Sequence, residues 1–405
     1  MSSSLTHLAA PLARCLALLA IALLVPIGTA RAGVPEGTPV EGVVRDLVDA
    51  MNERDPEAID AIIDARALGA RAYEALGAGS TSRRAFIDGI ARQSLGERIV
   101  RDLAADPGAV KLMRWVERDG ETRPLVRLRA VNGAFDYHEY FLEPRAEGGY
   151  RVVDWYQLSR GEPFSMVLAG LVRLTLDPDP GALERWLGTD ASDPTVTSAF
   201  RRLGALRAEG KATEALDLLD SLPPTIARSR PIMLLRVQFA AAIEGAADGP
   251  STRYAQTLAE LAEHHADESG VAFVLVDHYL LVGDLDRAAA ALLAVERRVG
   301  RDGMTGGILA SIYLDADRAA DAVTVAREAI RAEDDFEEVY FTLAAAQTML
   351  GEYAAVIDTY RQLEARFGYE FSRDVFEGDA EQVGFVASPE FEAWLPPTSE
   401  TDTPE

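Results

Sequence analysis

The feature that most constrains this chain is a period of 34 residues in its C-terminal half. Gly283, Asp317 and Gly351 are spaced by this period, and small or apolar residues recur at fixed distances around them. A fixed period of this length indicates structural units that stack on one another. The matching columns are Leu275/Leu309/Leu343, Val276/Ala310/Ala344, Tyr279/Tyr313/Gln347, Ala288/Ala322/Val356, Leu292/Ala326/Tyr360 and Val295/Ala329/Leu363.

Each unit is expected to be two antiparallel helices joined by a tight turn. The glycine or aspartate lies where the chain needs a left-handed or capping conformation. Neither helix can bury its apolar face alone, so each unit must pack on the next. The Leu-x3-Tyr pattern before the turn and the Gly-x4-Ala pattern after it resemble the tetratricopeptide repeat family. The resemblance implies an all-α solenoid that binds a protein or peptide partner.

The predicted tetratricopeptide solenoid covers residues 197–366, with about five hairpins. The resemblance is clearest over 268–366. A first unit is expected around Gly210, and a degenerate unit with an enlarged turn, Glu244 to Ser251, follows it.

The segment after the repeats departs from the period. Residues 367–395 are expected to form a C-terminal cap that packs on the last hairpin and covers the open end of the solenoid. Residues 396–405 are polar, acidic and proline-containing, and we expect them to be disordered. The large apolar residues of the cap are Phe371, Phe376, Phe385, Phe391, Trp394 and Leu395.

The first half has a different pattern. Helical periodicity is expected over 38–53, 56–77 and 81–104, and apolar residues then alternate with polar ones, as strands require. Asp119-Gly120, Asn132-Gly133 and Gly148-Gly149 are hairpin-turn pairs between the strands. The predicted strands of this four-stranded antiparallel sheet are 110–118, 123–132, 135–143 and 149–158.

Helices followed by such a sheet resemble the cystatin-like roll of the nuclear-transport-factor-2 (NTF2-like) superfamily. The expected fold is therefore an α+β module over residues 33–163, followed by the all-α repeats. Members of the superfamily include enzymes, small-ligand carriers and dimerisation modules, so the fold alone assigns no function. Dimerisation through this module is one possibility. Residues 164–196, which contain Asp177-Pro178-Asp179-Pro180, are expected to be a helical connector.

The N-terminus has the pattern of a secretory signal peptide over residues 1–32. Arg14 precedes a short apolar run, and Ala30-Arg31-Ala32 is an A-x-A cleavage site. The run is too short for a permanent membrane span, although an uncleaved anchor is the alternative. Cleavage would remove Cys15, the chain's only cysteine. Few lysines and many arginines and alanines suggest a GC-rich, Gram-negative bacterium, with the protein in the periplasm or secreted.

The charge balance restricts the partner. The formal net charge is −25, which disfavours nucleic acid and anionic membrane surfaces. A basic or neutral protein or peptide partner is favoured.

One candidate site lies in the sheet. If the sheet curls into a cone, His138 and Asp154 share its inner face with Tyr156 nearby, and could polarise a small substrate. The alternative is a strand histidine whose carboxylate lies on the outer face or in a satisfied core pair.

A second candidate site is the groove lined by the first helix of each hairpin. Large apolar side chains in such a groove suit an extended or helical peptide. The alternative is that Phe273 and Phe341 merely pack between neighbouring hairpins. The residues expected in the groove are Phe273, Asp277, Leu280, Leu281, Phe341, Ala345, Thr348 and Met349.

No residue pattern indicates a metal, a cofactor or a catalytic centre. His264-His265 points to two helix faces and chelates poorly. Asp177-x-Asp179 and Asp284-x-Asp286 lack the other ligands of a calcium loop, and Gly303 to Gly307 is expected to be a loop. The sequence therefore favours an exported scaffold that binds a protein or peptide. A small-ligand carrier or enzyme with a site in the N-terminal cone is the alternative, and a purely structural envelope protein is a third possibility.

Overall fold

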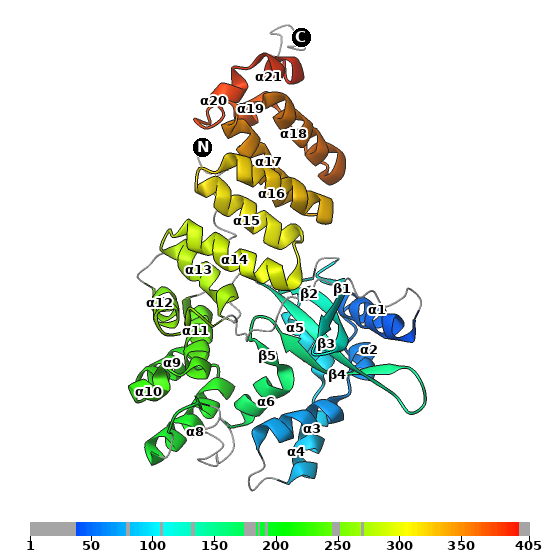
Figure 1. Cartoon of the computed structure of the whole chain (residues 1–405), viewed down its shortest axis with the longest axis vertical. Helices are drawn as coiled ribbons and strands as arrows, with labels where there is room; N and C mark the ends of the chain where they lie inside the picture. The colour runs from blue at the N-terminus through cyan, green and yellow to red at the C-terminus, as the bar shows by residue number, and fades with distance from the viewer. Residues whose placement is uncertain are drawn as a thin grey trace, which may run out of the picture. The chain divides into compact units, whose positions relative to one another are not determined.

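A computed structural model describes residues 38–77, 82–105, 108–130, 134–173, 184, 187–190, 193–244, 252–268 and 271–396 (Figure 1). They belong to two compact units, one ending at Val282 and the other beginning at Gly283. The predicted order of the chain, helices with an antiparallel sheet followed by a mostly helical part, is confirmed.

The described part of the first unit contains a five-stranded antiparallel meander in the order β1-β2-β3-β4-β5. The prediction of four strands is wrong by one, because the two-residue strand β5 is too short to show alternation. Asp119 and Gly120 both have positive φ, as the tight β1–β2 turn requires. The strands are β1 (Val110–Arg118), β2 (Glu121–Arg129), β3 (Phe135–Pro144), β4 (Tyr150–Gln157) and β5 (Glu162–Pro163).

Two of the three predicted N-terminal helices are each divided into two. The break in 56–77 occurs because Ile63 forms a bridge with Val152, after which the Asp64 side chain caps the next helix. The break in 81–104 occurs at Ser94, which caps the following helix. The resulting helices are α1 (Pro39–Asn52), α2 (Pro56–Ile62), α3 (Ala65–Leu76), α4 (Arg83–Ala91) and α5 (Leu95–Asp102).

These helices cover one side of the sheet. Tyr140 pairs with Trp155, and Val126 pairs with His138, so all four side chains share the side that we call the helix-facing side. Tyr140 and Trp155 are buried there in one apolar cluster with residues of α1–α5. The opposite side, the outer side, carries Phe135, Tyr137 and Glu139 on β3.

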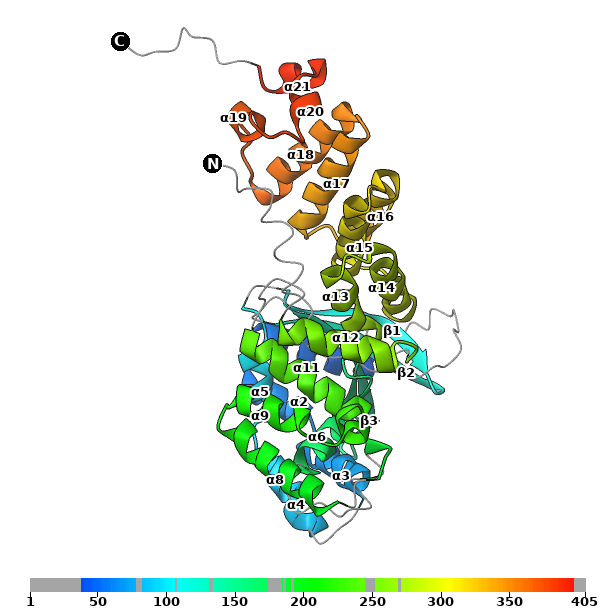
Figure 2. The ribbon, with the colours of Figure 1, turned by 90° about the vertical axis from the view of Figure 1, so that its left-hand side faces the viewer.

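The first unit continues through helices that pack in succession. Helices α8 and α9, α9 and α11, α11 and α12, and α12 and α13 are neighbours (Figure 2). Arg236 of α11 joins three of them, because it contacts Asp220 of α9 and Glu260 of α12 at 2.7 Å each. The helices are α6 (Phe164–Arg173), α8 (Pro194–Ala208), α9 (Ala212–Asp220), α10 (Pro224–Ala227), α11 (Arg230–Glu244), α12 (Arg253–His265) and α13 (Ala272–Leu281).

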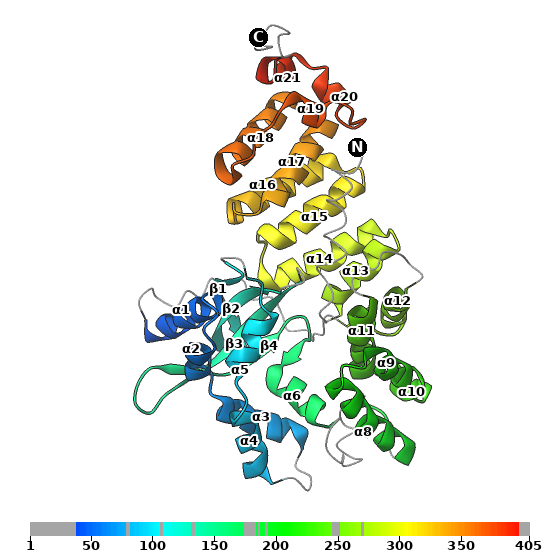
Figure 3. The same cartoon turned by 180° about the vertical axis from the view of Figure 1, so that it is seen from behind.

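The second unit is a stack of antiparallel helices. Helix α15 packs on both α16 and α17, and α17 packs on α18 (Figure 3). The helices are α14 (Leu285–Val299), α15 (Gly303–Asp315), α16 (Ala319–Ala332), α17 (Glu337–Met349) and α18 (Tyr353–Phe367).

The turns at the predicted anchor positions share one geometry. Gly210, Asp317 and Gly351 have φ of 70°, 57° and 71°. In each turn the next N–H donates to the carbonyl five residues earlier, which closes the preceding helix as in a Schellman motif. Gly283 also has positive φ.

The glycine-rich segment expected to be a loop is instead the first turn of α15. Asp302 caps this helix through a capping box with Thr305. A Cβ at Gly306 would lie 2.6 Å from the Cβ of Ala329, and one at Gly307 would lie 2.9 Å from Val339. The glycines thus allow α15 to approach α16 and α17 closely, a need that local sequence does not reveal.

Residues 368–396 form short helices and an aromatic cluster at the end of α18. The Tyr360 ring stacks on Trp394 at 5.6 Å and also contacts Phe371, Phe376 and Phe385. These residues bury apolar surface on the last hairpin. The short helices are α19 (Arg373–Phe376), α20 (Val383–Val386) and α21 (Pro389–Trp394).

Several predicted features lie outside the described residues. They are the signal peptide, the Asn132-Gly133 turn, the Asp177–Pro180 segment of the connector, most of the Glu244–Ser251 turn, and residues 397–405. Within the described ranges, no helix is both long enough and apolar enough to cross a bilayer.

The close packing of α15 leads to a test with two helical glycines. Gly306→Ala is expected to destabilise the protein by about 1–3 kcal/mol, because its methyl group overlaps Ala329. Gly89→Ala in α4, where a Cβ meets nothing within 4 Å, is expected to stabilise by about 0.5–1 kcal/mol through helix propensity. Thermal unfolding followed by circular dichroism measures both. Equal shifts in the unfolding temperature of the two variants would contradict the close approach of α15 to α16.

Candidate functional site

His138 and Asp154 do not share a face, so the predicted pair is wrong. His138 pairs with Gln157 across β3 and β4, whereas Asp154 pairs with Phe141. Side chains alternate along a strand, so His138 lies on the helix-facing side and Asp154 on the other. Tyr156 pairs with Glu139 and shares the side of Asp154.

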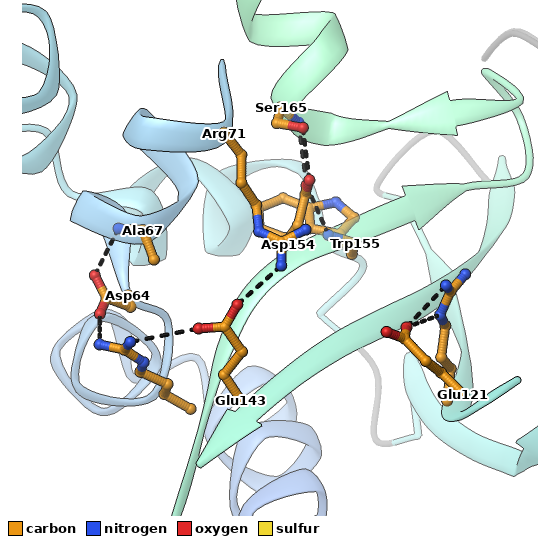
Figure 4. A network of polar contacts seen from close by, with 10 residues as sticks. Asp64, Ala67, Arg71, Glu121, Glu143, Asp154, Trp155 and Ser165 are labelled. Carbon is orange, nitrogen blue, oxygen red and sulfur yellow. Dashed lines mark hydrogen bonds and ion pairs between the residues drawn. The ribbon is translucent and has the colours of Figure 1, made fainter. Parts of the chain in front are cut away.

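Asp154 instead joins β4 to the start of α6 (Figure 4). Its carboxylate accepts hydrogen bonds from the Ser165 hydroxyl at 2.6 Å, the Ser165 N–H at 3.1 Å and the Trp155 N–H at 2.9 Å. Burial raises the pKa of Asp154, and the hydrogen bonds from Ser165 oppose this rise. With its oxygens occupied, Asp154 has a structural role.

Ion pairs beside Asp154 tie α3 to the sheet. Arg71 of α3 contacts Glu143 of β3 at 2.9 Å, and Arg151 of β4 contacts Asp64 (Figure 4). The side chains of Arg71 and Glu143 are partly exposed, so we expect their pair to contribute less than about 1 kcal/mol. These ion pairs position α3 on the sheet and do not form a binding site.

His138 lies in a separate polar cluster on the helix-facing side. Its Nε2 is 3.3 Å from Asp136, and its Nδ1 is 3.5 Å from the Tyr140 hydroxyl. Asp136 also accepts hydrogen bonds from the N–H and hydroxyl of Ser159. An imidazole that donates through Nε2 to Asp136 and accepts at Nδ1 from Tyr140 has both nitrogens engaged. His138 is therefore poorly placed as a free general base.

Two side chains next to His138 have buried polar atoms without a hydrogen-bond partner among the described residues. Trp155 is 3% exposed, and its indole N–H has no hydrogen-bond partner among the described residues. The side-chain oxygen of Gln157, whose nitrogen is 3.4 Å from His138 Nε2, is likewise buried without a partner. A buried polar group left unpaired costs about 1–3 kcal/mol. We define Asp136, His138, Tyr140, Trp155 and Gln157 as the indole cluster.

Sequence reasoning found only one member of this cluster. The period of two places Asp136, His138 and Tyr140 on one face, so that signal was present. Which residues of β4 join the cluster depends on the β3–β4 register. A register irregularity between Phe141 and Leu142 changes, for the part of β4 beyond it, the side of the sheet on which the residues lie.

The α13 residues predicted to line a groove are largely buried within the first unit. Phe273 is 3% exposed and packs edge-on against Phe135 of β3 at 5.2 Å. Asp277 is also 3% exposed and accepts a hydrogen bond of 2.7 Å from the Tyr254 hydroxyl of α12. The expectation that these two residues face a partner is therefore wrong. Leu280 and Leu281 are half-buried.

Burial changes the pH range in which the Asp277 carboxyl loses its proton. It raises the pKa of this carboxyl to about 8, although the Tyr254 hydrogen bond acts in the opposite direction. Burial also raises the pKa of Tyr254. Asp277 is therefore mostly neutral at pH 7, which allows it to lie between α12 and α13 without a cation.

The α17 residues of the predicted groove are more accessible. Phe341 is half-buried and packs edge-on against Tyr369 at 5.2 Å. Ala345 and Thr348 are also half-buried, while Met349 is 52% exposed. Phe341, Ala345 and Thr348 lie on α17 at spacings of four and three residues, so they share a face.

His265 and Asp284 have structural partners. His265 contacts Glu268 at 2.7 Å and the Arg228 carbonyl at 2.8 Å. Asp284 caps α14. Within the described part of the chain, no three His, Cys, Asp or Glu side chains gather as metal ligands would.

Comparison of the chain with known protein families, curated proteins and solved structures finds no match. Any assignment of function therefore depends on the sequence and the geometry above.

The buried carboxyl predicts a pH dependence of stability. Between the unfolded pKa of about 3.9 and the folded pKa of about 8, only the native state holds this proton. The free energy of unfolding should thus fall as pH rises through this window, by at most about 1.4 kcal/mol per pH unit. Asp277→Asn should remove this component.

Urea unfolding from pH 5 to 8.5, at intervals of about half a unit, measures the effect. Asp267→Asn, at an exposed position near the end of α12, is the control and should follow the wild type. Parallel curves for the wild type and Asp277→Asn would refute the assignment.

Proposed function

We propose that this chain is an exported binding protein whose helical hairpins are tetratricopeptide-type repeats that hold a protein or peptide. The observation that carries the proposal is the recurrence of one turn geometry at Gly210, Asp317 and Gly351. The last two are one sequence period apart, and Gly283 lies one period before them. Such recurrence is expected when one supersecondary unit is repeated.

The binding surface that we propose lies on α15 and α17. These first helices of two successive hairpins are neighbours, and Ser311 of α15 is 3.2 Å from Thr342 of α17 between their hydroxyl oxygens. Ala345, Thr348 and Met349 extend this surface on α17. Met349 and the adjacent Leu350, which is 44% exposed, supply apolar contact area of the kind that peptides use.

The charge near this surface supports a basic or neutral partner. Glu337 and Glu338 lie in the first turn of α17, and the whole chain carries −25. A cationic peptide would be attracted to it at low salt.

The alternative function is a small-ligand carrier, with the site in the N-terminal module. One observation favours it: on the helix-facing side of the sheet, the indole N–H of Trp155 has no hydrogen-bond partner in the part of the chain that the structure describes. The engaged nitrogens of His138 favour binding over proton transfer there.

Export predicts a defined mature N-terminus. If residues 1–32 are a cleaved signal peptide, the protein recovered from the periplasm of a Gram-negative host should begin at Gly33. N-terminal sequencing of the periplasmic and membrane fractions measures this. Ala32→Leu should block cleavage, whereas Ala20→Leu, within the apolar run, should not. An unprocessed wild-type protein in the membrane fraction would support an anchor instead.

The proposed surface predicts which variants lose a peptide. Peptides selected from a random library on the full chain should bind the double variant Ala345→Glu, Met349→Glu at least roughly tenfold more weakly, because buried carboxylates replace apolar contacts. Fluorescence polarisation measures the affinity. Val375→Glu with Val383→Glu is the control, because both valines are exposed on α19 and α20. If both double variants keep full affinity, the surface does not bind the peptides.

A further inference from the structure

Strand β1 forms one edge of the sheet, and among the described strands it pairs only with β2. The start of this edge is occupied by Asn52, the last residue of α1, which packs against β1 (Figure 1). The Asn52 side chain donates to the Val110 carbonyl at 2.8 Å and accepts from the Val110 N–H at 3.0 Å. The side chain thus takes the place of a neighbouring strand at this one residue.

The contacts of Asn52 reveal which backbone groups of β1 point away from the sheet. The N–H and C=O of a residue in an antiparallel strand point to the same side, and successive residues alternate. Since Val110 points to Asn52, Leu112 points outward too. Beyond the register irregularity that follows Leu112, Trp115 lies opposite Pro124. A proline without an N–H fits a pair that exchanges no hydrogen bonds, so Trp115 also points outward.

The outward backbone groups of Leu112 and Trp115 make no hydrogen bond to any other described residue. Farther along, the Arg118 side chain donates to the Glu117 carbonyl at 3.0 Å, which limits the open stretch at that end. Backbone groups left open along an edge form a template on which another strand can pair.

The opposite edge of the sheet is covered in its middle and at its end. Strand β5 pairs with β4 at Tyr156 and Gln157. Ile63 forms a bridge with Val152, and the Asp64 N–H donates to the Val152 carbonyl at 2.8 Å. Within the described part of the first unit, β1 is therefore the edge at which a strand can be added.

The two sides of this edge differ in their chemistry. On the helix-facing side, Leu112 and Trp115 pack against the apolar cluster. The outer side is basic, because cations outnumber carboxylates on its two outermost strands. The register places these charged residues on the outer side of β1 and β2: Lys111, Arg114, Arg118, Arg123, Arg127, Arg129 and Glu121.

This charge disfavours a second copy of β1 as the added strand. Two β1 edges would bring two basic outer sides together, and like charges on paired strands repel each other. Basic side chains and register irregularities on an edge strand hinder the association of identical edges. An acidic strand is attracted by the same cations, in addition to the contacts that these cations make within the protein.

We propose that the edge of β1 binds an extended segment of a partner protein in which acidic residues alternate with apolar ones. Its backbone pairs with Leu112 and Trp115, and its apolar side chains lie beside theirs on the helix-facing side. Its acidic side chains lie on the outer side, near Lys111 and Arg114. This surface belongs to the first unit, so the proposal does not depend on what the repeats bind.

The test uses the full chain and a synthetic peptide of about eight residues in which glutamate alternates with valine. Hydrogen exchange followed by mass spectrometry should show that amide protons in the fragment 110–118 exchange more slowly when the peptide is bound, because new backbone hydrogen bonds protect them. No change in this fragment at a saturating peptide concentration would refute the proposal. Protection that appears without peptide and rises with protein concentration would show a second copy on the edge, and would also overturn it.

Backbone methylation separates strand pairing from attraction by charge alone. A peptide residue opposite Leu112 or Trp115 has its side chain on the same side of the sheet, so the N–H groups of the valines are expected to face β1. N-methylation of the valines should abolish the protection. N-methylation of the glutamates, whose N–H groups face away, should leave it in place. Equal binding of the two methylated peptides would contradict the pairing.

A charge reversal tests the acidic class of partner. Arg114→Glu, at an exposed position, should weaken the glutamate peptide roughly tenfold and favour a peptide in which lysine alternates with valine. Fluorescence polarisation measures both affinities. Arg84→Glu in α4, where the side chain is 91% exposed, changes the net charge equally and should bind like the wild type. An equal loss in both variants would overturn the role of β1, and tighter binding of the lysine peptide by the wild type would overturn the acidic class.

Discussion

The pairing of β3 with β4 determines most of what the first unit can do. It brings Tyr140 opposite Trp155 on the helix-facing side, where both are buried against the N-terminal helices. The same pairing sends Asp154 to the other side, where it holds Ser165 and so fixes the start of α6. A slip of one residue would exchange these environments and place a carboxylate in the apolar cluster. The register thus specifies both the core and the path of the chain out of the sheet.

Features with a local cause were predictable from sequence. The positive φ at Asp317 and Gly351 follows from residue types that tolerate it, at positions that recur with the period. The strands β1 to β4 follow from alternation and from glycine-containing turns such as Asp119-Gly120. These features need no knowledge of what lies across the fold.

Features with a long-range cause were not predictable. The division of 56–77 depends on Val152, almost ninety positions away in the chain, which pairs with Ile63. The burial of Phe273 depends on Phe135, and nothing near α13 in the sequence indicates this neighbour. His138 and Asp154 each fitted an inward-facing pattern on their own strand, but only the register could show that the two patterns are out of phase. The indole cluster was missed for the same reason.

The aromatic cluster beyond α18 has a consequence for protein synthesis. Phe391 and Trp394 of α21 complete the contacts around Phe376 and Phe385. A nascent chain that terminates before α21 would leave the rings of Phe376 and Phe385 less covered, as an exposed apolar surface. Such a fragment would be a natural substrate for chaperones and proteases. Helix α21 thereby decides whether this aromatic surface is covered or exposed to water.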